Sequence, residues 1–140
     1  YQYDYLFLTN YARYEYAKNT YPEQFGVTKK ILLSNIKNVG DNDEYVVNFN
    51  RAIKRGWTHF DNAVICALRL MDRIHAKEIV LAGFDGFKNV YNESYADETL
   101  PTLNPGGEWD KLNKEILDMF NDVKSTTQLN IKFLTESIYE

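Results

Sequence analysis

The feature that most constrains the fold is a series of five short apolar segments, each followed by polar or turn-forming residues. They are Tyr5–Leu8, Ile31–Ser34, Tyr45–Asn48, Glu78–Ala82 and Ile131–Thr135. Most of them are continuously apolar, whereas a strand with one face in water alternates apolar and polar residues. The pattern therefore favours strands that are covered on both faces, as in a parallel sheet.

Helical patterns lie between these strands. The clearest is Asp61–His75, where apolar residues recur at a spacing of three and four and Asp61 is a candidate N-cap. Glu108–Lys124 is a second amphipathic segment, and Tyr11–Asn19 and Phe49–Gly56 show weaker patterns. Alternation of strands and helices predicts an α/β fold, a Rossmann-like open, mostly parallel sheet of about five strands with flanking helices.

The length of 140 residues, with 44% hydrophobic residues, is that of one domain with a substantial core. We therefore expect a single Rossmann-like α/β domain over residues 1–140. A strand pattern begins almost at once and the chain does not open with Met. This leads us to expect a fragment of a larger α/β domain, excised from the C-terminal part of a longer chain. The segment Tyr91–Gly107 has no periodicity and is typical of a lid or binding loop.

Charge and composition exclude several classes of function. The net charge is -4 and the basic residues are scattered, so we expect no nucleic-acid partner. Apolar runs are far shorter than the roughly 20 residues of a membrane span, and we expect none. The single cysteine, Cys66, lies in an apolar helical pattern, which fits a reducing, cytoplasmic location. Dinucleotide and P-loop fingerprints are absent from the sequence.

Polar residues follow every predicted strand. Because the carboxyl ends of parallel strands share one edge of a sheet, these side chains are candidates for a ligand-binding crevice. They are Thr9, Asn10, Ser34, Asn35, Asn48, Asn50, Asp85, Thr135 and Ser137. Amides and hydroxyls supply donors and acceptors that suit a sugar, a ribose or a pyrimidine edge. The same residue types also end strands because they form turns, and both explanations stay open at each position.

Asp85, in the segment "AGFDGF", is the acid of this set. It could act as a general base, accept a hydrogen bond from a ligand hydroxyl or bind a metal, or it could form an Asx turn between Gly83 and Gly86. No His or second carboxylate stands at ligand spacing, so we expect no metal site. His59, before the Asp61 helix, is a second candidate base, and a surface or packing role is the alternative.

Two helix starts are candidate anion sites, because free backbone N–H groups point out of a helix N-terminus. One consists of Asp61, Asn62 and Ala63, and the other follows the turn Pro105–Gly107. Cys66, in the middle of a helix, is a poor nucleophile.

Several segments together resemble a known family. They include "YDYLFLTNYARY", "ILLSN", "EYVVNFN", "DNAVICALRLMDRIHAKEIVLAGFDGF" and "IKFLTESIY". Together they resemble the C-terminal domain attached to 4-hydroxy-2-oxovalerate aldolase-like (HMG-CoA lyase-like) proteins of bacterial surface-polysaccharide loci. The resemblance spans nearly the whole chain, and its most specific part is Asp61–Phe87. It implies an aldolase-type barrel, and a strand with a glycine-containing phosphate loop, upstream of Tyr1.

The same part is more distantly similar to bacterial sialyltransferases that use CMP-sialic acid. That similarity implies donor contacts at Asn10 and at the helix start Asp61–Ala63. It also implies that Tyr95 matches a tyrosine that assists the phosphate leaving group. The first such tyrosine falls on Phe87, and the catalytic His is absent from the matching region near Pro105.

Three hypotheses for the function follow. The leading one is an accessory domain that binds a nucleotide or sugar-like ligand, or positions the aldolase-type barrel, in surface-polysaccharide biosynthesis. This domain itself would hold no cofactor. The second is a glycosyltransferase with Asp85 or His59 as the base, and the third is a structural or homo-oligomerisation module, suggested by eleven Tyr and eight Phe. The candidate ligand-binding residues are Asn10, Asn35, Asn48, Asp61, Asn62, Asp85, Tyr95 and Ser137.

Overall fold

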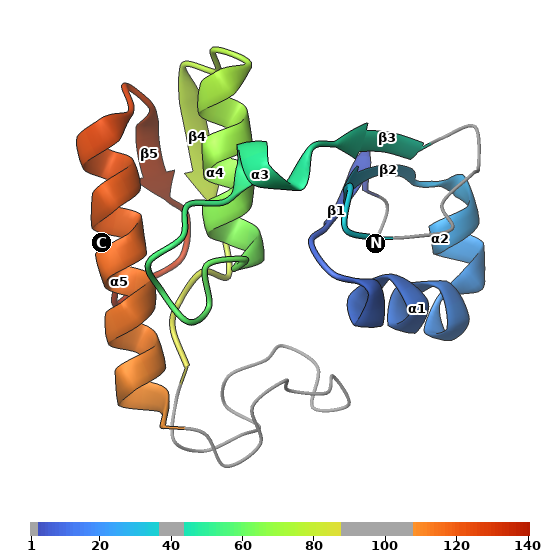
Figure 1. The fold of residues 1–140 in the computed structure, drawn as a ribbon, viewed down its shortest axis with the longest axis horizontal. Coiled ribbons are helices and arrows are strands. Elements are labelled where there is room, and N and C mark those ends of the chain that lie inside the picture. The colour runs from blue at the N-terminus through green and yellow to red at the C-terminus, as the bar shows by residue number, and fades with distance from the viewer. Residues whose placement is uncertain (1–2, 37–43, 88–107) are drawn as a thin grey trace. The chain divides into compact units, whose positions relative to one another are not determined.

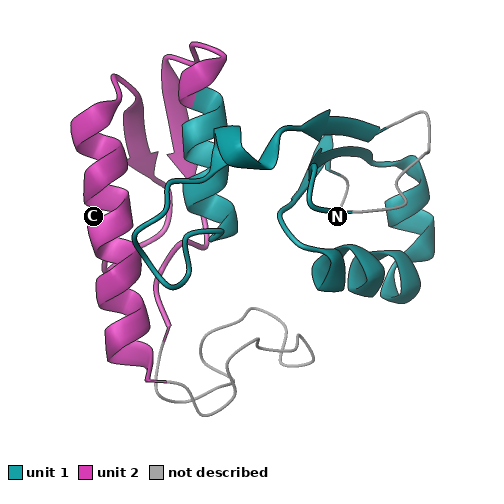
Figure 2. Cartoon of the chain, in the orientation of Figure 1, with its two compact units in different colours: residues 1–71 teal, residues 72–140 magenta. Residues whose placement is uncertain are grey.

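A computed structural model describes residues 3–36, 44–87 and 108–140 as an α/β protein with two small parallel sheets (Figure 1). The elements are β1 (Tyr5–Leu8), α1 (Tyr11–Thr20), α2 (Pro22–Val27), β2 (Lys29–Leu33), β3 (Glu44–Val47), α3 (Phe49–Ala52), α4 (Ala63–Arg73), β4 (Glu78–Leu81), α5 (Trp109–Thr126) and β5 (Asn130–Phe133). They form two compact units, residues 1–71 and 72–140 (Figure 2). The predicted loop Tyr91–Gly107 lies outside the described residues.

The first unit contains a three-stranded parallel sheet in the order β1-β2-β3. One face of this sheet is covered by α1 and α2. Leu8 and Leu32 lie in a buried cluster with Tyr14 of α1 and Phe25 of α2. The rings of Tyr14 and Phe25 meet edge to face, with 5.2 Å between their centroids. Aromatic and branched side chains thus join the helices to the sheet.

The other face of this sheet is covered only in part. Leu33 clusters with Ala52 of α3 and Cys66 of α4, which fills the half of the face near the carboxyl ends of the strands. At the other half, Tyr5 and Tyr45 are 51% and 54% exposed. Burial of the strands on both faces is therefore found for the end of β2 but not for the amino-terminal half of this face.

The second unit contains β4 and β5, which pair in parallel with Glu78 opposite Asn130 and Leu81 opposite Phe133. Amphipathic helix α5 supplies most of the buried residues of this unit. Its apolar residues recur at helical spacing, so one side of the helix is buried and the other is in water. Phe120 of α5 lies 5.7 Å, centroid to centroid, from Phe133 of β5.

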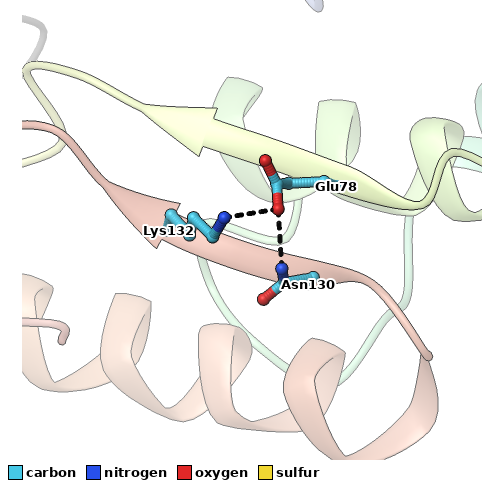
Figure 3. Close-up of polar contacts among 3 residues, drawn as sticks. All are labelled: Glu78, Asn130 and Lys132. Atoms are coloured by element: carbon cyan, nitrogen blue, oxygen red, sulfur yellow. Dashed lines mark hydrogen bonds and ion pairs between the residues drawn. The ribbon is translucent and has the colours of Figure 1, made fainter.

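A polar contact joins the two strands of this sheet (Figure 3). Oε2 of Glu78 accepts a hydrogen bond of 2.8 Å from the amide of Asn130 and lies 2.6 Å from Nζ of Lys132. The contact with Lys132 is the main reason that the pKa of the Glu78 carboxyl is lowered. The residues are exposed, so we expect the pair to contribute little to stability.

The five predicted strands are all present, with bounds that differ by at most two residues. They form one sheet of three strands and one of two, and a single five-stranded sheet is not seen. Helix α2 was not predicted, because six residues with Pro22 at the start and Gly26 inside give too short a pattern. Among the described helices, none is long and apolar enough to cross a membrane.

Candidate functional site

The polar residues after β1 and β3 cap the helices that follow. Asn10 is the N-cap of α1, and its Oδ1 accepts a hydrogen bond of 3.0 Å from the backbone N–H of Arg13. Asn48 is the N-cap of α3 and accepts from the N–H of Asn50 at 3.0 Å. Both side chains therefore satisfy backbone donors that a helix start leaves free. Their oxygens are engaged within the protein, which accounts for these two residues without a ligand.

The residues after β2 tie the ends of the three strands together. Nδ2 of Asn35 donates a hydrogen bond of 2.9 Å to the carbonyl of Thr9, beyond the end of β1. The hydroxyl of Ser34 accepts one of 3.0 Å from the N–H of Phe49, beyond the end of β3. Within this sheet, the strand-end residues therefore lie at one edge, as predicted, and hydrogen bonds join the ends of the three strands.

The start of α4 differs from the prediction in one respect. The helix begins at Ala63, and Oδ1 of Asn62 accepts from the N–H of Ile65 at 3.2 Å. The prediction that Asp61 is the N-cap is therefore wrong, because Asn62 occupies the position one residue before the helix. The carbonyl of His59 accepts from the N–H of Asn62 at 3.0 Å, which places His59 in the turn before the helix.

Cys66 is fully buried in α4, as its sequence pattern predicts. Burial, together with a smaller effect of the nearby carboxylate of Asp61, raises the pKa of its thiol to about 12. At neutral pH the thiol keeps its proton, so Cys66 is not a nucleophile.

In the second unit, the ends of β4 and β5 are joined through Thr135. The hydroxyl of Thr135 accepts a hydrogen bond of 2.9 Å from the N–H of Gly83 and donates one of 2.7 Å to Oδ1 of Asp85. Both Asp85 and Thr135 are exposed. This pair places a carboxylate and an oriented hydroxyl side by side at the carboxyl edge of the sheet.

The C-terminal segment holds the rest of the turn after β4. The N–H of Ile138 donates to the carbonyl of Asp85 at 3.3 Å. Ser137 donates its hydroxyl proton to the carbonyl of Phe84 and accepts from the N–H of Tyr139 at 3.1 Å. Ser137 therefore has a structural role in closing this segment onto the turn.

Asn113 of α5 fixes the end of the same turn. Its Oδ1 accepts from the N–H of Phe87 at 2.9 Å, and its Nδ2 donates to the carbonyl of Phe87 at 2.8 Å. The hydroxyl of buried Tyr139 also donates to Oδ1 of Asn113, at 2.8 Å. Phe87 stacks on Trp109 with 5.2 Å between centroids. The Asp85 turn is thus held from α5 as well as from the C-terminal segment.

Sequence reasoning missed Asn113. Asn is unfavourable inside a helix, but the sequence of α5 alone does not distinguish Asn113 from the exposed Asn121. Tyr95 and the turn Pro105–Gly107 lie outside the described residues. Within the described part of the chain, no group of three or more His, Cys, Asp or Glu side chains could hold a metal ion.

Comparisons with protein-family models, with curated proteins and with solved structures find no match to this chain. The geometry and the sequence must therefore carry the functional argument.

Proposed function

We propose that this chain is a cytoplasmic accessory domain that binds a nucleotide or a sugar-like ligand, attached to an aldolase-type barrel that acts in bacterial surface-polysaccharide biosynthesis. The sequence segments that resemble such C-terminal domains support two parts of the proposal: the attachment to an aldolase-type barrel and the role in surface-polysaccharide biosynthesis. The ligand part of the proposal is supported by the geometry of the second unit.

The observation that carries the ligand part is the exposed pair of Asp85 and Thr135. Oδ1 of Asp85 is engaged by Thr135, whereas Oδ2 accepts no hydrogen bond from a described residue. A ligand hydroxyl can donate to that oxygen, and hydrogen bonds to a carboxylate are stronger than those between neutral groups. Because the backbone contacts already fix the turn, little ordering free energy is lost on binding. Ribose and hexose rings present neighbouring hydroxyls that fit a carboxylate beside a hydroxyl.

The proposal includes a single Rossmann-like sheet. Both sheets are parallel, and β1 and β4 each pair on one side only among the described strands. Parallel pairing of β1 with β4 would give the order β3-β2-β1-β4-β5, which is a doubly wound order. Hydrogen exchange tests this part: the amides of β1 and β4 that do not bond to β2 or β5 should be protected. Exchange of these amides as fast as in loops would contradict the single sheet.

Titration of CMP, other nucleotides and CMP-sugars, followed by backbone amide shifts, tests the ligand part. The chain and its upstream-extended form are both used. We expect shifts at Gly83, Asp85 and Thr135. Asp85→Asn should weaken binding about tenfold, because it removes a charge-assisted hydrogen bond, while Asp118→Asn, an exposed acid of α5, should not change it.

Absence of shifts around Asp85 in both forms of the protein would overturn the ligand part. Turnover of a CMP-sugar by the full-length protein, lost in Asp85→Asn, would replace the proposal with the glycosyltransferase hypothesis.

A further inference from the structure

The sheet of the first unit carries two exposed tyrosines on one face. Tyr5 of β1 and Tyr45 of β3 are both about half exposed, and their ring centroids lie 6.3 Å apart with 55° between the ring planes. Strands two apart in a sheet are separated by roughly 9.5 Å. The rings therefore lean toward each other across β2 and form one aromatic surface.

Lys29 adds a positive charge to this surface. It is paired in register with Tyr5, it is exposed, and its Nζ lies 5.8 Å from the centroid of the Tyr5 ring. The next residue, Lys30, points to the opposite face, where it is buried with its Nζ over Phe25. Lys29 is the charged residue of β1, β2 and β3 on the face that holds Tyr5 and Tyr45.

A tyrosine ring offers an apolar face and a hydroxyl that donates and accepts hydrogen bonds. The C–H face of a sugar ring can lie on the apolar face of the tyrosine ring, while the sugar hydroxyl groups hydrogen-bond to the tyrosine hydroxyl. An ammonium group beside the ring attracts a carboxylate. A nucleic acid would instead require a row of basic residues along its phosphates, which one lysine on a chain of net charge -4 does not supply.

We propose that Tyr5, Tyr45 and Lys29 form a binding surface for an acidic saccharide, with the sugar ring against the tyrosines and its carboxylate paired with Lys29. This surface lies in the first unit and is separate in sequence from Asp85 and Thr135. Failure of one proposal therefore leaves the other untouched.

Glucuronate and glucose are matched probes, since they differ by the carboxylate. In titrations of the full chain followed by NMR, we expect glucuronate to shift the ring signals of Tyr5 and Tyr45 and to bind up to about fivefold more tightly than glucose. Lys29→Gln should remove this difference, because it removes the ion pair. Tyr45→Ala should abolish binding of both sugars, whereas Tyr11→Ala, an exposed tyrosine of α1, should not.

Several results would overturn the proposal. They are equal binding of glucuronate and glucose to the unaltered protein, unchanged binding in Tyr45→Ala with the fold intact by circular dichroism, and tighter binding of a single-stranded oligonucleotide than of glucuronate. Lys29 is exposed, so Lys29→Gln tests the carboxylate contact without affecting the core.

Discussion

The hydroxyl of Thr135 donates a hydrogen bond of 2.7 Å to Oδ1 of Asp85, although the two residues are 50 positions apart in the chain. The same hydroxyl accepts from the N–H of Gly83. Asp85 therefore takes part in the turn after β4. Its role in the turn is compatible with the proposed ligand contact, because the two use different oxygens of one carboxylate.

We predict that Asp85 and Thr135 are energetically coupled. Asp85→Ala and Thr135→Val should each lower the free energy of unfolding by about 1 kcal/mol, because exposed hydrogen bonds are lost. The double variant should lose less than the sum, by roughly 0.5 kcal/mol or more, since the shared bond is removed only once. Urea unfolding of the four proteins measures this coupling, and additive losses would contradict it.

We predict that Asn113 stabilises the second unit strongly. Asn113→Ala removes three hydrogen bonds to Phe87 and Tyr139, and it should lower the free energy of unfolding by about 2–4 kcal/mol. Asn121 lies on the same helix, is exposed and is a matched control. Asn121→Ala should be neutral or slightly stabilising, because Ala is the better helix former. Equal effects of the two substitutions in urea unfolding would contradict a role for the Asn113 contacts.

The local elements could be predicted from the sequence because each depends on neighbouring residues. The runs around Leu8, Leu32 and Val80 show β-strand patterns, and α5 shows a clear helical period. The N-cap of α4 was predicted at Asp61 and is Asn62, because both residue types cap helices and the position of the first turn decides between them.

The tertiary contacts of the strand-end residues could not be predicted in the same way. Asn is suited both to ligand contacts and to helix N-caps. At Asn10 and Asn48, only the backbone conformation decides between these two roles. The contact between Asn113 and Phe87 joins residues 26 positions apart, and no local pattern encodes it. Exposure of Tyr45 likewise depends on which elements cover the sheet.

We predict that Gly86 does not tolerate a side chain. Its φ is 101°, and an added Cβ would lie 2.5 Å from Cδ1 of Ile138. Gly86→Ala should lower the free energy of unfolding by about 1–3 kcal/mol through backbone strain and this contact. The control is Gly26→Ala, which lies inside α2 with open space around it and should stabilise by up to about 1 kcal/mol. A second change, Ile138→Ala, should recover part of the loss at Gly86, and no recovery would assign the loss to backbone strain alone.

We predict a pH dependence from the contact between Glu78 and Lys132. The pKa of Glu78 is lowered in the folded protein from an ordinary value of 4.5. The contact therefore stabilises the fold above that value, and its contribution is lost as the pH falls through the lowered pKa. Lys132→Met should remove this part of the pH dependence, and high salt should weaken it. The thermal midpoint measured against pH tests the prediction, and identical acid profiles of the two proteins would contradict it.

We predict that alkylation of Cys66 reports unfolding of the first unit. The pKa of the thiol rises from 9.0 to about 12 on burial, so the folded protein should react with iodoacetamide far more slowly than the unfolded chain.

The raised pKa stabilises the fold fully below about pH 9, and this stabilisation is lost as the pH rises toward 12. Cys66→Ala should flatten the stability profile in that range, and Tyr139→Phe should remove the separate contribution of Tyr139, whose pKa burial also raises to about 12.

Asp61→Asn should leave the burial of Cys66 intact and shift the onset of alkylation to lower pH, because it removes a negative charge that helps to raise the pKa of the thiol. Alkylation at neutral pH without denaturant, at the rate of the unfolded chain, would show that Cys66 is accessible.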